Sequence, residues 1–512
     1  MKKLPIGIQN FKEIRSENYY YVDKTIFIKK LFDSGKYYFL SRPRRFGKSL
    51  FLDTLKEAFI GNKNLFYGLY LYDNWDGEKN YPVIKIDLSK TSTESEIHLE
   101  KSFFYIINSL AEEYQIDLKE EFIQFRFEEL LKKIHKNYNK KIVILIDEYD
   151  KPILDVITNE NLAKRNRNIL KNFFEIIKSN DELIQFVFIT GVSRFSKVSL
   201  FSGLNQLRDI TLSEEFSTIC GYTQYELENT FKDRLKDFDT NKIKQWYDGY
   251  NWLGENVYNP FDILLFFSEK IFRPYWFETA TPTFLIQIFE KYHYFLPHLE
   301  NLKVGDYLIS NLDIDYIYPE NLLFQTGYLT IKDFIYKNNK IYYILTYPNL
   351  EVKISLNDAF LQYLTPHPIP NIQIDIQEAF ENNDFEKLYQ TLYQFFSSIL
   401  YEWYRKNELD KYEGYYASVI YALLNGAGLN IIAEDNTNTG RIDLTIIYLN
   451  KIFLLEFKVI KNTTDKKALE QIKEKKYYKK YKDNYKDIFL IGIEFSKEER
   501  NIINFEWEKY KD

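Results

Sequence analysis

A Gly-Lys-Ser tripeptide at residues 47–49 is the first candidate for chemistry. It ends the stretch 41–49, SRPRRFGKS, which follows the apolar run 37–40 and precedes apolar positions at helical spacing. In such a loop, backbone N–H groups and the positive helix end hold phosphate, Lys48 reaches the outer phosphates, and Ser49 ligates magnesium. The residues expected to contact a nucleotide here are Arg45, Gly47, Lys48 and Ser49.

The loop departs from the pattern G-x-x-x-x-G-K-S/T at its first position. Arg42 stands where the pattern has glycine, and Pro43 lacks an N–H that could face phosphate. Arg44 and Arg45 add positive charge that could offset the missing donor. An ordinary helix that begins with Gly-Lys-Ser is the alternative, but the flanking strand and helix favour nucleotide binding.

Two carboxylates, Asp147 and Glu148, follow the apolar run 142–146. The run predicts a strand buried on both faces of a parallel sheet, and ligands bind at the carboxyl ends of such strands. Asp147 is expected to hold magnesium beside Ser49, and Glu148 to orient and deprotonate the attacking water. A strand that ends in a solvated turn is the alternative.

A third polar segment follows the predicted strand 183–189. Thr190 or Ser193 could contact the terminal phosphate or the water. Arg194 could act as an arginine finger within one chain or between copies of a homo-oligomer. Polar residues also cap strands commonly, and capping is the alternative.

The C-terminal part carries a second charged group on two predicted strands. The strand 440–447 carries Asp443, and the strand 451–458 carries Glu456 and Lys458, which share a face because they are two residues apart. Asp443 and Glu456 could bind magnesium that activates water for attack on a phosphodiester, and Lys458 could position that water. The exposed face of a half-solvated hairpin is the alternative.

Two flanking helices extend this group. The amphipathic helix predicted over 412–421 could supply the carboxylate of Glu413, and the helix that begins at Ala468 could bring Gln471 over the site. The metal ligands expected at the two sites are Ser49, Asp147, Glu413, Asp443 and Glu456.

Residues 458–487 form the strongest basic stretch, with eleven lysines and five acidic residues. The tyrosines that interleave with these lysines are Tyr477, Tyr478, Tyr481 and Tyr485. Phosphate contacts with base stacking would explain the pattern, and so would a solvated helical face with core tyrosines.

Composition indicates a folded protein of several domains. The chain has 512 residues and a net charge of -6, so affinity for nucleic acid must come from a local patch. The single cysteine, Cys220, excludes an internal disulfide and predicts a reducing compartment. We expect a cytoplasmic protein with no membrane partner, because no apolar run has signal-peptide or membrane-spanning character.

These elements predict an α/β chain with four parts. Between the core and the C-terminal site, 212–302 is mostly helical, the stretch 326–345 predicts a β-hairpin with a turn at Asn338 and Asn339, and 365–370 predicts a linker. The expected parts are a P-loop core at 1–211, a helical lid at 212–302, a small winged-helix-like unit with the linker at 303–370, and an α/β domain at 371–512.

The chain resembles the bacterial and archaeal AAA-ATPase-like family of uncharacterised proteins over essentially its whole length. The motifs that carry the resemblance are YVDKT at 21–25, RPRRFGKS at 42–49, IDEYD at 146–150, TGVSRF at 190–195, WYDGY at 246–250, YNPF at 258–261 and YW at 275–276. Relatives share the arginine at the position of Arg42. The resemblance implies an additional-strand P-loop ATPase core.

The C-terminal residues resemble the PD-(D/E)XK nuclease superfamily, in the subgroup fused behind AAA-ATPase-like domains. The matching order is Glu413 on a helix, Asp443 on a strand, Glu456-x-Lys458 on the next strand and Gln471 on a helix. All positions are filled, so the resemblance implies an intact magnesium site.

The leading hypothesis is a protein that binds and hydrolyses ATP and couples this to Mg²⁺-dependent cleavage of nucleic acid, with DNA favoured over RNA. The alternatives are a nucleotide-dependent switch or scaffold whose C-terminal domain binds a partner without cutting it, and a nuclease whose P-loop domain is only structural.

Overall fold

Two compact units make up the chain. The computed structural model describes residues 1–76, 80–195, 201, 204–277, 295–310, 318–399, 413–460 and 468–511. Met1–Trp276 and Lys303–Asn349 form the N-terminal unit, and Phe277–Leu302 and Leu350–Asp512 form the C-terminal unit. The four-part division at 211, 302 and 370 stays a prediction.

The N-terminal unit is built on a five-stranded parallel sheet with the order β2-β3-β4-β1-β5. Its strands are β1 (Tyr37–Ser41), β2 (Val83–Asp87), β3 (Ile142–Asp147), β4 (Ile184–Gly191) and β5 (Arg208–Asp209). The strands predicted from the apolar runs are confirmed. Every residue of β1 and β3 is buried, as expected when helices cover both faces of a sheet.

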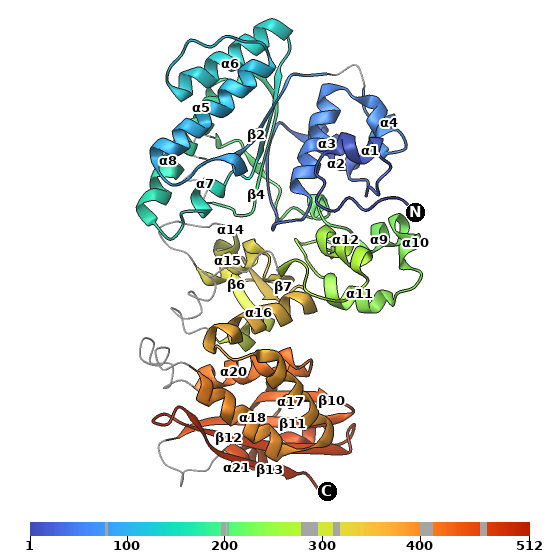
Figure 1. Cartoon of the computed structure of the whole chain (residues 1–512), viewed down its shortest axis with the longest axis vertical. Coiled ribbons are helices and arrows are strands. Elements are labelled where there is room, and N and C mark those ends of the chain that lie inside the picture. Colours follow the sequence, from blue (N-terminus) through green and yellow to red (C-terminus); the bar gives the residue numbers. More distant parts are fainter. Residues whose placement is uncertain are drawn as a thin grey trace. The chain divides into compact units, whose positions relative to one another are not determined.

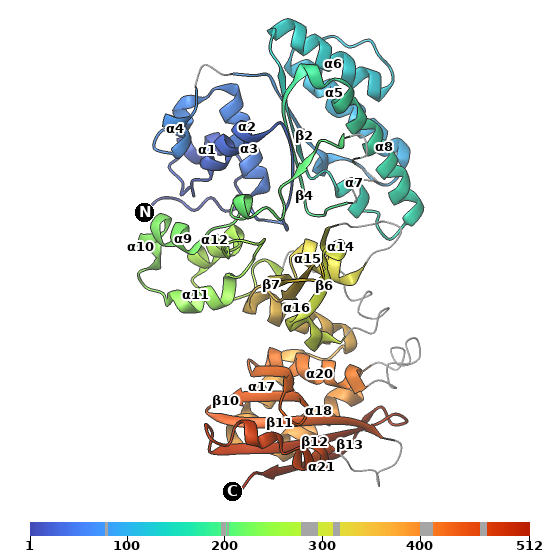
Figure 2. The same cartoon turned by 180° about the vertical axis from the view of Figure 1, so that it is seen from behind.

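Helices lie on both sides of this sheet (Figures 1 and 2). One side carries α1 (Phe11–Ser16), α2 (Thr25–Ser34), α3 (Lys48–Ile60) and α4 (Tyr70–Asn74). The other carries α5 (Glu96–Glu113), α6 (Ile123–Tyr138), α7 (Lys151–Leu154) and α8 (Glu160–Ser179). The helical region predicted from 95 to 139 is two helices, because the chain turns after α5 at Gln115, whose φ is 54°.

The segment after β5 is predicted to be mostly helical, and in its described part helices are the main regular elements, joined by long irregular stretches. It contains α9 (Gln224–Thr230), α10 (Lys232–Leu235), α11 (Thr240–Tyr247) and α12 (Pro260–Glu269). Thr223 and Glu226 form a capping box at α9, and the Asn259 side chain caps α12. Residues 278–294 of the predicted lid lie outside the described residues.

The predicted β-hairpin is confirmed as β7 (Thr330–Lys337) and β8 (Lys340–Thr346). Both turn residues, Asn338 and Asn339, have positive φ, which matches the twist of a two-residue hairpin turn. The strand β6 (Leu302–Gly305) completes a three-stranded sheet, with α14 (Asp306–Ser310) and α15 (Pro319–Thr326) nearby in the chain.

The C-terminal unit contains a second five-stranded sheet with the order β13-β12-β11-β10-β9. Its strands are β9 (Asn430–Asn436), β10 (Arg441–Tyr448), β11 (Lys451–Ile460), β12 (Asp487–Ser496) and β13 (Asn501–Lys509). Strands β11 and β12 are parallel, and the other pairs are antiparallel. The predicted hairpin of the second charged group is β10 and β11.

The described part of this unit contains five α-helices: α16 (Leu350–Leu364), α17 (Ile369–Asn382), α18 (Phe385–Ser398), α20 (Glu413–Gly426) and α21 (Ala468–Lys475). The stretch 365–370, predicted to be a linker, joins α16 to the start of α17, and both helices belong to the C-terminal unit. Pro370 lies in the first turn of α17, where a missing N–H costs no helical hydrogen bond. Within the described ranges, no helix has both the length and the hydropathy to cross a bilayer.

Candidate functional sites

A cavity of about 510 Å³ lies at the carboxyl ends of β1 and β3 in the N-terminal unit. The loop after β1 turns into α3 at Gly47, whose φ of 87° is readily adopted only by glycine. The polar lining includes Arg45, Gly47, Lys48, Ser49 and Glu148. The apolar lining includes Ile8, Tyr222, Phe261 and Leu264. One cavity therefore offers charged groups for phosphates and an apolar wall for a base.

Lys48 is buried and bonded to its own loop. Its Nζ donates to the carbonyl oxygens of Arg42 at 2.9 Å and Pro43 at 2.8 Å. Burial lowers the pKa of Lys48, and the nearby charge of Asp147 opposes this shift.

Ser49 and Asp147 meet as predicted, although β1 and β3 are separated by β4 in the sheet. The Ser49 hydroxyl lies close enough to the Asp147 carboxyl to lower its pKa, but burial has the larger effect and the net shift is upward. Glu148 lines the cavity with φ 49°, and burial together with the charge of Asp147 raises its pKa. A hydroxyl and carboxylates next to a lysine form a donor set that suits Mg²⁺ and phosphate.

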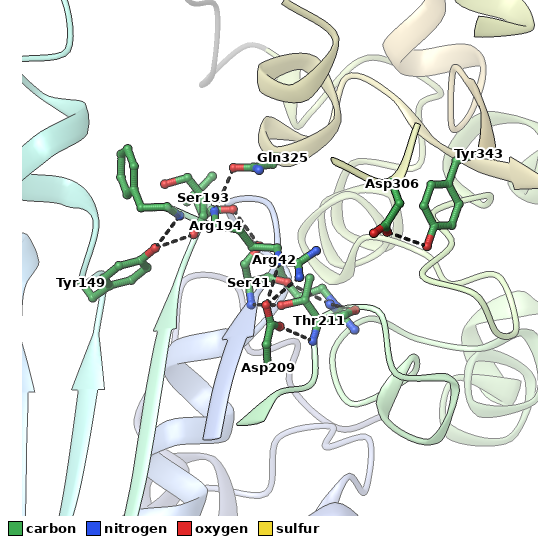
Figure 3. Close-up of polar contacts among 12 residues, drawn as sticks. Ser41, Arg42, Tyr149, Ser193, Arg194, Asp209, Thr211, Asp306, Gln325 and Tyr343 are labelled. Carbon is green, nitrogen blue, oxygen red and sulfur yellow. Dashed lines mark hydrogen bonds and ion pairs between the residues drawn. The ribbon is translucent and has the colours of Figure 1, made fainter. Parts of the chain in front are cut away.

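Arg42 has a structural role that the sequence did not reveal. Its fully buried guanidinium donates to the carbonyl oxygens of Ser41, Thr211, Phe216 and Ser217, and lies 4.1 Å from the Trp252 ring centroid. Figure 3 shows the side chain among Ser41 and Thr211. The arginine in the place of the first loop glycine therefore fixes the loop to the segment after β5. Only the tertiary contacts identify this role.

We expect Arg42→Ala to lower the free energy of unfolding by about 3 kcal/mol or more, because buried carbonyl oxygens lose their donors. Urea titration of the full chain measures this change. The exposed neighbour Arg44 is the matched control, and Arg44→Ala should change stability by no more than about 0.5 kcal/mol. Equal effects at the two positions would contradict the assigned role.

Arg45 lies at the cavity with φ 68°, and its guanidinium is 3.8 Å from the Phe261 ring centroid. Burial lowers its pKa, and the charge of Asp262 opposes this. A half-exposed arginine stacked on an aromatic wall could contact either a phosphate or a base.

Ser193 and Arg194 are not among the residues that line the cavity. The backbone N–H and hydroxyl of Ser193 both donate to Asp150 Oδ2, at 2.6 and 2.5 Å. Arg194 forms an ion pair with Asp209 at 2.7 Å, and its backbone N–H donates to Gln325 (Figure 3). Ser193 and Arg194, which the sequence predicts to contact the nucleotide, are thus bonded to other residues of the protein.

Asp150 is a residue that the sequence reasoning missed. It lines the cavity, it is fully buried, and its Oδ2 accepts from the backbone N–H groups of Val192 and Ser193. It therefore ties the segment after β3 to the end of β4. Its position three residues after Asp147, in the run IDEYD, is the only sequence signal.

The predicted residues of the C-terminal unit also come together. Lys458 Nζ lies 3.5 Å from Glu413 Oε1 and 3.6 Å from Glu456 Oε1. Gln471 Nε2 donates to Glu456 Oε1, and Asp443 Oδ2 accepts from the Phe457 backbone N–H at 2.8 Å. The hairpin, α20 and α21 thus place all five side chains around one end of β11.

The carboxyls of this group have raised pKa values. Burial raises the pKa of Asp443 to about 6. Burial and the charge of Asp443 raise that of Glu456 to about 8. Burial lowers the pKa of Lys458, but the charges of Glu413, Glu456 and Asp443 outweigh it and the net shift is upward. Two adjacent carboxyls that resist joint ionisation favour an added cation.

The fit of this group to a divalent ion is incomplete in one respect. No three carboxylate, imidazole or thiol groups of the described residues are arranged so that they could share one ion. However, the buried Oε2 atom of Glu456 has no hydrogen-bond partner among these residues, and it lies next to Asp443. Two carboxylates, one of which has a free buried oxygen, can hold an ion that keeps part of its water shell.

Helix α21 reaches Glu456 because Gly492 of β12 has no side chain. A Cβ atom at Gly492 would lie 2.4 Å from the backbone N of Leu469. The Glu494 side chain accepts from the Ala468 backbone N–H at 3.1 Å, which holds the first turn of α21. Gly492 and Glu494 therefore set the position of Gln471.

We expect Gly492→Ala to push α21 away from the sheet and to destabilise the chain by about 1 to 3 kcal/mol. Thermal unfolding of the full chain measures this loss of stability. Gly414 of α20 is the control, because a Cβ there would make only ordinary contacts at 3.4 Å. Gly414→Ala should be neutral or stabilising, since alanine favours helix. A Gly492→Ala chain as stable as the Gly414→Ala chain would contradict this account.

The basic stretch after β11 does not offer all its tyrosines to a ligand. Tyr477 and Tyr481 are buried in a core cluster with Ile472, so for these two the structure favours the alternative of core tyrosines over base stacking. Tyr481 donates to the buried Asp435 at 2.5 Å. Burial of an aromatic ring excludes base stacking on it. Lys461, Lys466 and Lys467 lie outside the described residues.

Each of the two sites lies in a part of the chain that matches a known family. Residues 5–201 match a family model described as a predicted AAA-ATPase, and residues 411–505 match the PD-(D/E)XK nuclease superfamily. An uncharacterised protein in the vnfD 5' region of Azotobacter chroococcum mcd 1 is 44% identical over 507 residues, which cover 98% of each chain.

Proposed function

From the membership of this chain in the AAA-ATPase-like family with a C-terminal PD-(D/E)XK nuclease-superfamily domain, we propose that it binds and hydrolyses ATP and cleaves nucleic acid with Mg²⁺. Lys48 and Ser49 line one cavity and the buried Asp147 lies close to both, which supports the ATPase half. The meeting of Asp443, Glu456 and Lys458 supports the nuclease half.

In the proposed ATPase site, Lys48 exchanges its two loop carbonyls for the outer phosphate oxygens. Ser49 and Asp147 hold the magnesium ion, which neutralises phosphate charge when bound. Glu148 accepts a proton from the attacking water, and its raised pKa makes it a stronger base than an exposed glutamate. The position of β4 between β1 and β3 fits an additional-strand core.

In the proposed nuclease site, Asp443 and Glu456 hold the divalent ion, which supplies an activated water when bound. Lys458, between Glu413 and Glu456, orients that water and offsets the charge of the phosphodiester in the transition state. Gln471 fixes one oxygen of Glu456 and leaves Oε2 for the ion.

A nuclease assay tests the whole proposal. Single-stranded and duplex DNA and RNA are incubated with Mg²⁺ or a chelator, each with ATP, a non-hydrolysable analogue or no nucleotide. Cleavage that needs Mg²⁺ and changes with nucleotide supports the coupled enzyme. Cleavage indifferent to nucleotide would leave a nuclease with a structural P-loop domain. Nucleic acid binding without cleavage would favour the switch or scaffold instead.

A further inference from the structure

Arg441 is an exposed cation beside the carboxylates of the C-terminal site. It lies two residues before Asp443 on β10, and its charge and that of Lys458 both lower the pKa of Asp443 against the effect of burial. The side chain of Lys458 is 25% exposed and lies between Glu413 and Glu456, whereas that of Arg441 is 57% exposed. Arg441 is therefore the more accessible of these two cations.

The guanidinium of Arg441 is held by a carboxylate on the neighbouring strand. Glu434 Oε1 lies 2.9 Å from Arg441 NH1, and Glu434 Oε2 lies 3.2 Å from His298 Nε2. In the strand register, Ile442 pairs with Asp435 and Leu444 with Ala433, so Glu434 and Asp443 lie between these two pairs. The ion pair with Glu434 uses one nitrogen of the Arg441 guanidinium. Because a guanidinium carries five N–H donors, other donors remain for a ligand.

Stability does not explain the conformation of Glu434. Its φ is 50°, in the left-handed region, which costs a non-glycine residue about 1 kcal/mol or more. An exposed ion pair such as that between Glu434 and Arg441 stabilises the fold by only about 0 to 1 kcal/mol, which does not offset this cost. A strained residue that orients an exposed arginine is expected at a binding site rather than in a structural support.

The backbone of Arg441 is connected to the carboxylates through Tyr477. The Tyr477 hydroxyl donates to the Arg441 carbonyl oxygen at 3.0 Å, and a Cβ atom at Gly440 would lie only 2.8 Å from that hydroxyl. Tyr477 also lies near Gln471, which donates to Glu456, and near the charges of Glu456 and Asp443. The position of Arg441 is thus fixed relative to the group that would hold the ion.

We propose that Arg441 binds a backbone phosphate of the nucleic acid next to the bond that is cut, and that Glu434 and His298 orient its guanidinium. This inference rests on the proposed nuclease function. An arginine fork matches the geometry of phosphate oxygens, and a substrate anion that approaches several carboxylates needs an accessible cation beside them.

The salt dependence of binding tests this role, because each phosphate contact contributes about 0.9 to the slope of log affinity against log salt. A short labelled duplex DNA and its single strand are titrated with the full chain, with Ca²⁺ in place of Mg²⁺. We expect Arg441→Ala to reduce the slope by about 0.9 on duplex and to weaken binding about tenfold. Arg441→Lys should keep the slope and recover only part of the affinity. Glu434→Gln should keep the slope but weaken binding.

Lys387→Ala is the matched control. Lys387 pairs with Asp375 and Glu378, and the adjacent Glu381 and Asn383 contact the Lys451 end of the hairpin, away from Arg441. Its loss should leave the slope unchanged. An Arg441→Ala slope equal to that of the wild type, or a Lys387→Ala effect of equal size, overturns the role of Arg441 alone. A wild-type chain that neither binds nor cuts nucleic acid overturns the nuclease proposal as well.

Discussion

Replacement of Asp443 by asparagine should lower the Mg²⁺-dependent cleavage rate about a thousandfold, which corresponds to about 4 kcal/mol of transition-state stabilisation. Asparagine can still accept the Phe457 N–H bond that Asp443 accepts at 2.8 Å. The variant should therefore lose the charge that holds the ion and keep the fold. Single-turnover cleavage of a labelled duplex measures the loss.

The stability of this variant gives a readout that does not depend on activity. The charge of Asp443 raises the pKa of Glu456, so its removal relieves repulsion, and the metal-free variant should unfold at the same or a higher temperature. Mg²⁺ should raise the unfolding temperature of the wild type and not that of the variant. The control Asp487→Asn removes an exposed charge paired with Lys509 and should keep both responses. Wild-type cleavage by Asp443→Asn would refute the site.

The second large effect is expected at Lys48. Lys48→Ala should weaken ATP binding about a hundredfold, because a charge-assisted contact to phosphate is worth up to about 3 kcal/mol. Nζ donates to the carbonyl oxygens of Arg42 and Pro43, and these two hydrogen bonds hold the amino group of Lys48 at the cavity. Calorimetric titration with ATP and Mg²⁺ measures the affinity.

Lys29→Ala provides the control for the loss of a positive charge. Lys29 is on α2 and forms an ion pair with Asp33 of the same helix, and no residue of α2 lines the cavity. Its replacement should leave ATP affinity within about twofold, because exposed pairs contribute little. If Lys48→Ala and Lys29→Ala bind ATP equally well, the cavity is not a phosphate site.

Local sequence patterns were sufficient for the strands and for the grouping of polar residues at their ends. The apolar run of β3 could be recognised because a strand buried on both faces must be apolar at every position. The hairpin of β7 and β8 could be recognised because Asn338 and Asn339 tolerate positive φ. Lys48, Ser49 and Asp147 could be grouped because parallel strands bring their carboxyl ends to one edge.

Only the tertiary structure shows which partners the charged and polar side chains have, because these partners are distant in the sequence. Ser193 could be placed at the end of β4 from sequence, but not on Asp150, and Arg194 could not be placed on Asp209. The sequence determined that Arg42 departs from the loop pattern, whereas only folding brought it to the carbonyls of Thr211 and Phe216. Hydrophobic periodicity in the sequence predicts which positions are buried. The hydrogen-bond partner of a buried polar group depends instead on which segments pack together, and no local sequence pattern predicts that packing.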